Sequence, residues 1–464
     1  MRKGARRWLA YRIVALQAET YDYVSRSCSS ASYLPALYGI RSGRYYGVMN
    51  RLDQPSRDEL LERFLRYVRI ETTSDRHRNE IPSSEAQWDL LKLLVKELQD
   101  IGVSDLEMME HGHILARIPA SRGAKRAPTI GFMAHVDTAA DAPGADVHPR
   151  LHENYDGGRI EVGQGLVLDP QDSPALADRV GDTIITTDGR TLLGADDKAG
   201  VAEIMTAAAW LNAHTELEHG PLELIFTPDE ETGRGLDFFP VEKLASRCCY
   251  TMDGGEEGVI ETECFNAYHV RAVFSGRVIH LGTARGRLVN AVTMAGAFLD
   301  MLPASESPEA TDGRYGYYCP LEIKGNLERA ELDVFIRDFE EAGITRRLET
   351  LRSIARAVET IYQPGKCELT ETRQYLNMNT FVQKDPLVSD LLIEAVRLSG
   401  VEPVVKVIRG GTDGAHLSEK GIPTPNVFTG GHNYHSRLEW ASRSTMERAT
   451  ETILSLISLW AAER

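Results

Sequence analysis

The sequence has few cysteines, and they form no recognisable metal or redox motif. Its six cysteines include no CxxC pair, and their spacing does not suggest a disulfide framework. A reducing cytoplasm is therefore the predicted setting. Cys248 and Cys249 lie within an apolar run, so we expect them in the core rather than among metal ligands.

Long apolar runs and an excess of basic residues are also missing. No stretch of 18 or more residues is continuously apolar, so the sequence predicts no transmembrane helix and no membrane partner. Lys and Arg number 52 against 68 Asp and Glu, and the net charge of -16 argues against a nucleic-acid partner. A hydrophobic content of 42% is typical of a globular protein, and 464 residues predict two or three domains.

The first 48 residues differ from the rest of the chain in charge. They hold eight Lys or Arg against Glu19 and Asp22, a net of +6, which leaves -22 for the remainder. An Arg-rich, acid-poor start is typical of a targeting peptide. The alternative, which we favour, is a disordered upstream extension at residues 1–49, with Met49 as the working initiator.

Five apolar runs have the length and composition of strands buried in a parallel sheet. They cover residues 129–136, 222–226, 248–252, 404–408 and 425–428. Helical patterns lie between or after them, including residues 201–211, 387–398 and 444–460. This alternation predicts an α/β fold in which helices flank a mostly parallel central sheet.

The pattern changes between residues 265 and 375. Strands are predicted at 267–274, 317–324 and 331–336, and helices at 287–302 and 344–362. An α+β segment of this size is typical of a separate small domain. The catalytic domain would then be split into residues 50–264 and 376–464.

Five side chains lie where a predicted core strand ends or enters the loop before a helix: His135, Asp196, Glu231, Asp253 and His435. Carboxyl ends of parallel strands share one edge of a sheet, so we expect these residues to meet. Any one alone could be a turn or cap residue. Together they suit Zn²⁺, with Mn²⁺ or Co²⁺ possible. The set is too large for one ion, and one carboxylate can bridge two.

Local patterns add three smaller expectations. Glu230 precedes Glu231, and an extended backbone would point one to a metal and the other to a water or substrate. Ser56 with Glu59, and Ser84 with Gln87, have the spacing of capping boxes at helix starts. His111 and His113 could form a metal-binding pair, but we expect them to flank a hairpin turn at Gly112.

Several strings make the sequence recognisable. AHVDTA, GADDKAG, TPDEETGRG, DGG, RGGTDGAHLS and NYHSRLEW resemble the dizinc aminopeptidases of the peptidase T (tripeptide aminopeptidase) family. The resemblance runs from about Leu60 to the C-terminus. It includes segments that hold none of the candidate catalytic or metal-binding residues, such as ESPEATDG at 306–313 and IRDF at 336–339.

The resemblance implies a role for each matching position. The five residues above match the family's metal ligands, two Zn²⁺ per subunit, with Asp196 as the bridge. Asp137 matches the acid that supports His135, and Glu230 matches the general base. An Asp rather than a Glu at position 253 resembles the aminopeptidases of the wider superfamily more than its carboxypeptidases.

Three further positions concern the substrate. Arg409 matches an arginine expected to hold a peptide carboxylate. His280 matches a histidine that reaches a metal site, commonly that of the partner subunit, and stabilises the oxyanion. Asn290 is expected to help bind the peptide. The chain departs from the family at Leu281, where the family usually has Pro after this histidine.

The sequence therefore predicts a metal-dependent enzyme that releases the N-terminal residue of short peptides, most often tripeptides. Residues 265–375 would form a lid through which a homodimer assembles. One alternative is a related dizinc amidohydrolase acting on dipeptides or N-acyl amino acids. Another is a relative that binds peptides without hydrolysing them.

Overall fold

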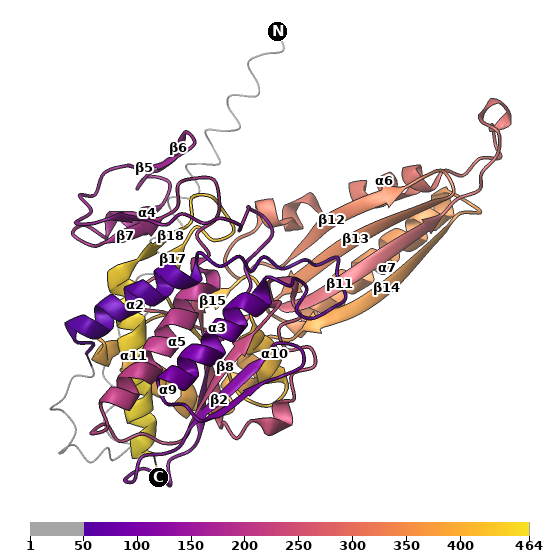
Figure 1. The fold of residues 1–464 in the computed structure, drawn as a ribbon. Helices are drawn as coiled ribbons and strands as arrows, with labels where there is room; N and C mark the ends of the chain where they lie inside the picture. The colour runs from indigo at the N-terminus through magenta and orange to yellow at the C-terminus, as the bar shows by residue number, and fades with distance from the viewer. Residues whose placement is uncertain (1–50, 464) are drawn as a thin grey trace, which may run out of the picture. The chain divides into compact units, whose positions relative to one another are not determined.

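The computed structural model describes residues 51–463 (Figure 1). The predicted extension at residues 1–49 lies outside them. Among the described helices, none combines the length and the apolar character that crossing a membrane would need.

An eight-stranded sheet forms the centre of the first part of the fold. Its order is β1-β2-β8-β3-β9-β16-β10-β15. The strands β8, β3, β9 and β16 run parallel, and β15 runs parallel to β10. The antiparallel pairs are β1–β2, β2–β8 and β10–β16. The bounds are β1 (Asp105–Met108), β2 (Ile114–Ile118), β3 (Ile130–His135), β8 (Leu222–Thr227), β9 (Cys248–Gly254), β10 (Val259–Cys264), β15 (Val404–Ile408) and β16 (Asn426–Phe428).

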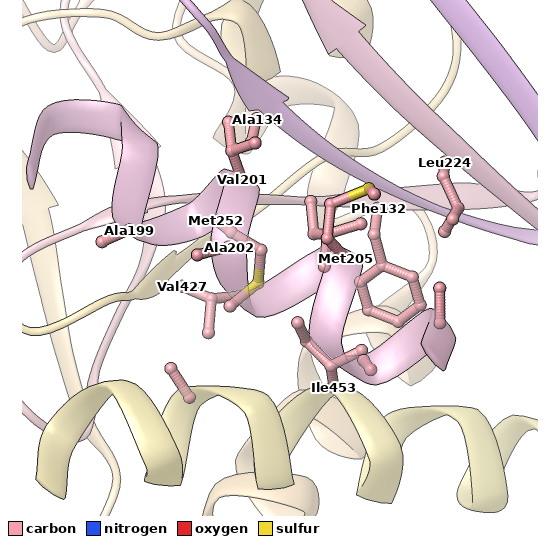
Figure 2. Close-up of a cluster of buried hydrophobic side chains, with 14 of the residues drawn as sticks. Phe132, Ala134, Ala199, Val201, Ala202, Met205, Leu224, Met252, Val427 and Ile453 are labelled. Carbon is pink, nitrogen blue, oxygen red and sulfur yellow. The ribbon is translucent and has the colours of Figure 1, made fainter. Parts of the chain in front are cut away.

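The central strands are apolar throughout because both faces of the sheet are covered. On β3, Phe132 and Ala134 join the larger hydrophobic cluster, whereas Met133 joins the cluster on the opposite face. Figure 2 shows the larger cluster, in which Val201 and Met205 of α5 lie among residues of β3, β8 and β9. The helices in contact with this cluster are α2 (Gln54–Tyr67), α3 (Gln87–Asp100), α5 (Ala195–Ala213), α9 (Pro386–Leu398) and α11 (Arg443–Ala462).

A second, antiparallel sheet of order β12-β13-β11-β14 has its own hydrophobic cluster. Its strands are β11 (Asn266–Ser275), β12 (Tyr317–Gly325), β13 (Arg329–Asp338) and β14 (Lys366–Tyr375), with helices α6 (Ala291–Asp300) and α7 (Glu341–Ile361). Val270, Ala272 and Phe274 pack toward these helices. The predicted α/β class with an inserted α+β segment is confirmed. β14 was not predicted, because its charged and polar residues leave little apolar pattern at the edge of the sheet.

Smaller sheets complete the fold. One has the order β17-β18-β7-β4, and β5 pairs with β6. The bounds are β4 (Arg150–His152), β5 (Ile160–Gly163), β6 (Leu166–Leu168), β7 (Ile184–Thr186), β17 (Gly431–His432) and β18 (Trp440–Ser442). Short helices are α4 (Pro174–Ala177), α8 (Asn379–Val382) and α10 (Asp413–Glu419). The loop between β17 and β18 carries His435.

Both capping-box predictions were wrong. Helix α2 begins earlier than expected, and Asp53 caps it by accepting the N–H of Ser56 at 3.0 Å. Helix α3 begins at Gln87, and Ala86 at its cap position offers no side-chain acceptor. The Gln87 amide instead donates to Asp229 at 2.7 Å, since a tertiary partner is available for it.

Candidate metal centre

The five predicted ligands meet at one end of the large sheet, around the carboxylate of Asp196. Its Oδ1 lies 3.0 Å from Nε2 of His135, and its Oδ2 lies 3.2 Å from Nε2 of His435. Asp253 Oδ1 lies 3.6 Å from the same nitrogen of His135. Glu231 Oε1 lies 3.0 Å from the same nitrogen of His435. The cluster thus has two halves, each with one imidazole and one further acid, joined by Asp196.

Three of the predicted ligands lie at or just after the end of a strand of the large sheet. His135 is the last residue of β3, and Asp253 lies at the end of the neighbouring strand β9. Glu231 follows β8 in a short 3-10 helix, η1 (Glu230–Thr232). The expectation of an extended backbone at Glu230 and Glu231 was therefore wrong. The chain turns sharply there because Asp229 adopts a left-handed conformation, with φ of 57°.

Asp137 supports two of these elements at once. Its Oδ1 lies 3.3 Å from Nδ1 of His135, on the side of the ring opposite the cluster. The same carboxylate accepts the backbone N–H groups of Glu230 at 2.9 Å and Glu231 at 3.2 Å. The side chain is fully buried. Asp137 therefore fixes both the ring of one ligand and the turn that carries another.

The cluster is strongly negative, and the pKa values of its members reflect that. Burial alone would raise the pKa of Asp196, but its contacts with both histidines outweigh burial and hold the value well below its usual range. Contacts with Asp196 and then Glu231 raise the pKa of His435 to about 11. Burial raises the pKa of Glu231 to about 7 and that of Asp253 to about 6. It also raises the pKa of Glu230 well above its usual range.

The donor atoms fit a pair of divalent cations. Glu231 Oε1 is buried, and its polar partner is Nε2 of His435 at 3.0 Å, an atom that would itself serve as a metal ligand. Donor atoms lie within 4.8 Å of one another in two sets, His135–Asp196–Glu231 and His135–Asp197–Asp253. Asp197 is the weaker candidate ligand because its oxygens already accept the backbone N–H groups of His135 and Gly200. Imidazoles and carboxylates suit Zn²⁺ and its neighbours.

Comparison with known proteins identifies the family. The model of peptidase family M20/M25/M40 matches residues 186–459. The chain belongs to this family. It is 45% identical to a peptidase T from Geobacillus thermodenitrificans over 406 residues, which cover 87% of this chain and 98% of that one. The predicted peptidase T relationship is confirmed, and the chain is a peptide hydrolase of the M20 family.

Solved structures share the fold of this M20 peptidase. A tripeptidase from Staphylococcus aureus aligns with a TM-score of 0.69 at 18% identity, covering 87% of this chain and 98% of that one. A Bacillus subtilis protein described as a dinuclear metal binding peptidase of the M20 family aligns with a TM-score of 0.59 at 16% identity, covering 88% and 99%. The family therefore includes enzymes that bind two metal ions, as the two halves of this cluster lead us to expect.

The M20 peptidase also holds acids at this site that sequence reasoning missed. Asp197 accepts the backbone N–H of His135 at 3.1 Å. Asp413 is buried, accepts the hydroxyl of Thr227 at 2.6 Å, and has its pKa raised by burial to about 7. Glu439 accepts three backbone N–H groups. The strings GADDKAG, RGGTDGAHLS and NYHSRLEW contain all three acids, but no local pattern distinguishes them from ordinary caps.

Two of the predicted substrate residues make only local contacts within the described chain. His280 precedes η3 (Leu281–Thr283), and its Nδ1 accepts the N–H of Gly282 at 3.1 Å. Asn290 caps α6, accepting the N–H of Val292 at 2.9 Å. No hydrogen bond or ion pair within residues 51–463 joins either of them to the metal-ligand cluster. Their predicted roles in peptide binding remain predictions.

Arg409, directly after β15, is bound to the inserted segment. Its Nη1 donates to the carbonyls of Gly313 at 2.9 Å and Tyr315 at 2.8 Å, and its Nη2 donates to Thr311 Oγ1 at 2.9 Å. The guanidinium also lies 5.3 Å from the ring centroid of Phe265. These partners occupy the donors that were predicted to hold a substrate carboxylate.

The hairpin prediction for His111 and His113 is confirmed. Gly112 has a φ of 82°, and the N–H of Met109 donates to the carbonyl of His113 at 2.8 Å. His113 is buried and its Nε2 lies 2.9 Å from the carbonyl oxygen of Gly235, while His111 stacks on Phe238. The pair is therefore structural.

Proposed function

We propose that this M20 peptidase is a two-metal aminopeptidase that releases the N-terminal residue of short peptides, with tripeptides as the preferred class. The observation that carries the proposal is the placement of the Asp196 carboxylate. Its two oxygens each face a different histidine, at 3.0 and 3.2 Å. A carboxylate placed in this way suits a bridge between two cations.

We propose Zn²⁺ as the metal, with Mn²⁺ or Co²⁺ as alternatives for the same donors. His135 and Asp253 would hold one ion, His435 and Glu231 the other, and Asp196 would bind both. When bound, the two cations supply a Lewis acid and lower the pKa of a water molecule.

Glu230 is proposed as the general base that takes a proton from the attacking water and returns it to the leaving amine. Its backbone N–H is held by Asp137, beside the ligand Glu231. Its own carboxylate makes no hydrogen bond to any residue in the described part of the chain, which leaves it available to a water. A positioned carboxylate of this kind contributes about 10² to 10⁴ in rate.

The inserted segment, residues 265–375, is proposed to act as a lid and as the interface of a homodimer. His280 would then reach the active site of the second subunit, where it could stabilise the oxyanion. Arg409 is proposed to bind the substrate carboxylate after releasing the loop at residues 311–315. A cytoplasmic location is proposed because all five described cysteines are free thiols.

The test combines metal analysis with a substrate panel. Purified enzyme should carry two equivalents of Zn²⁺, Mn²⁺ or Co²⁺ by mass spectrometry and hydrolyse a tripeptide faster than the matching di- and tetrapeptides. An N-acetylated tripeptide should be a poor substrate. Preference for an N-acyl amino acid or a dipeptide would instead support the related amidohydrolase. Tight peptide binding without turnover by the two-metal protein would indicate a binding protein.

A further inference from the structure

Glu439 makes an unusual set of contacts near the metal centre. Its side chain is only 1% exposed. Oε2 accepts the backbone N–H groups of Leu193 at 2.7 Å and Gly194 at 2.8 Å, and Oε1 accepts that of Asp196 at 3.1 Å. Three backbone donors of one turn therefore converge on a single buried carboxylate.

The turn needs such support because regular structure does not fix it. Gly194 is left-handed, with φ of 79°. Asp196 has φ of -84° and ψ of 103°, which is not helical although helix α5 is assigned from Ala195. The helix ladder therefore does not set the direction of the Asp196 side chain. The hydrogen bonds to Glu439 tie down the backbone at and before this residue.

Glu439 and His435 also belong to the same loop, between β17 and β18. The loop therefore meets the turn twice, once through the carboxylate of Glu439 and once where His435 Nε2 lies 3.2 Å from Asp196 Oδ2. These contacts join positions 243 and 239 residues apart in the chain. One loop supplies both a ligand and the anchor of another ligand.

We propose that Glu439 is a positioning residue that sets the Asp196 carboxylate between the two histidines and so determines the affinity for both metal ions. The inference rests on the proposed two-metal function. Residues that orient metal ligands typically contribute 10- to 100-fold to metal affinity or activity. Because Asp196 would bind both ions, the affinity for both should fall when its support is lost. Loss of the support of a ligand that binds one ion would lower the affinity for that ion alone.

The chain offers a matched control in Glu223. It is also 1% exposed, and its carboxylate accepts the backbone N–H groups of Ala245 at 3.0 Å and Ser246 at 3.0 Å. It lies near the start of β8, at the end of the strand away from Glu231. Glu223→Gln removes the same kind of anchor from a site without metal ligands.

The experiment compares Glu439→Gln and Glu223→Gln with the wild type. A Gln side chain offers one acceptor oxygen in place of two and adds two donors, so it cannot satisfy three N–H groups. Zn²⁺ affinity is measured by competition with a chelating dye, and unfolding by urea. Both variants should lose stability, but only Glu439→Gln should lose about 10- to 100-fold in affinity for both equivalents. Its kcat should fall more than its KM changes.

Wild-type Zn²⁺ affinity in folded Glu439→Gln would overturn the proposal, as would an equal loss in Glu223→Gln. Glu439→Asp keeps both acceptor oxygens and should bind Zn²⁺ with an affinity between those of the wild type and Glu439→Gln. If Glu439→Gln does not fold, wild-type Zn²⁺ affinity in Glu439→Asp would overturn the proposal and a reduced affinity for both equivalents would support it. Failure of the wild type to bind two equivalents would instead contradict the proposed function.

Discussion

The carboxylate of Asp137 joins Glu230 to His135: its Oδ1 accepts the N–H of Glu230 at 2.9 Å and lies 3.3 Å from Nδ1 of the imidazole. One buried side chain therefore sets the position of the proposed base relative to a proposed ligand. This link is made through the backbone of Glu230, so changes at the Glu230 carboxylate should leave the ligand in place.

Glu230→Gln should accordingly retain both metal equivalents and lose about 10² or more in kcat, as expected for loss of a general base. The amide has nearly the shape of the carboxylate and keeps the backbone bond to Asp137. Metal content by mass spectrometry and steady-state turnover of a tripeptide check this. Turnover close to that of the wild type would remove Glu230 from the mechanism.

Asp141 should support His435 as Asp137 supports His135. Its Oδ2 lies 3.4 Å from Nδ1 of His435, the ring nitrogen that faces away from Asp196. Asp141→Ala should therefore lower the affinity for one metal equivalent by about tenfold, the low end of the usual effect, because the side chain is 69% exposed. Chelator competition resolves the two equivalents.

Asp146→Ala is the control for that variant. Asp146 Oδ1 lies 3.1 Å from Nε2 of His148, both side chains are exposed, and within residues 51–463 neither forms a hydrogen bond or ion pair with the metal-ligand cluster. The control should bind metal like the wild type. A loss in both variants would mean that general negative charge near the site, rather than support of His435, is what matters.

Arg409→Ala should impair hydrolysis of a tripeptide far more than that of its C-terminal amide. Loss of a desolvated, charge-assisted pair costs about 2 to 5 kcal/mol, which is roughly 30- to several-thousand-fold in kcat/KM. Kinetics of both enzymes on both substrates form a double cycle. In the structure Arg409 binds the loop at residues 311–315. An equal loss of kcat/KM on the tripeptide and on its amide would mean that holding this loop is its role.

Replacing Glu203 should stabilise the protein. This side chain of α5 is fully buried, and neither of its carboxylate oxygens has a hydrogen-bond partner among residues 51–463. Burial raises its pKa well above the usual value of 4.5. Exchange of buried ion pairs for apolar residues of similar volume gains about 1 to 4 kcal/mol in favourable cases, and Glu203 has no partner among residues 51–463 to offset its burial. We expect a gain of this order for Glu203→Met at pH 8.

The gain should depend on pH. Because the folded pKa of Glu203 lies above the unfolded value, the folded protein binds more protons above pH 4.5, and its stability falls as pH rises toward the folded pKa. Urea unfolding should therefore show a larger benefit of Glu203→Met at pH 8 than at pH 5.5. Glu451→Met is the control: Glu451 accepts the N–H of Leu52 and pairs with Arg448, so its loss should destabilise.

The sequence predicted which side chains would meet at the candidate metal centre, and the family resemblance added Asp137, but the other supporting groups were not predicted. His135 and Asp253 lie at the ends of apolar runs whose length and composition suit buried strands, and strand ends meet at one edge. Glu439 and Asp413 are acids in ordinary polar stretches. Their roles depend on partners as far as 246 positions away in the chain, and no local sequence pattern reveals such partners. Gln87 failed as a capping residue for the same reason, since Asp229 competes for its amide.

Arg409 illustrates a further limit. Its residue type and its place before two glycines fit the binding of a carboxylate, and the resemblance to the family points the same way. The structure places it against backbone carbonyls of the inserted segment, an alternative set of acceptors that the sequence does not reveal. A guanidinium satisfies either kind of partner, so chemistry alone could not choose between them.

The strand order of the large sheet means that the sheet can be completed only late in synthesis of the chain. β9 and β10 are consecutive in the chain, but β16 lies between them in the sheet, and β16 is synthesised only after the whole inserted segment. Until then, β9 and β10 each lack a neighbour, and the loop that carries His435 does not yet exist. If His435 is a metal ligand as proposed, a nascent chain cannot hold the second ion, and we expect peptide hydrolysis only once the sheet is complete.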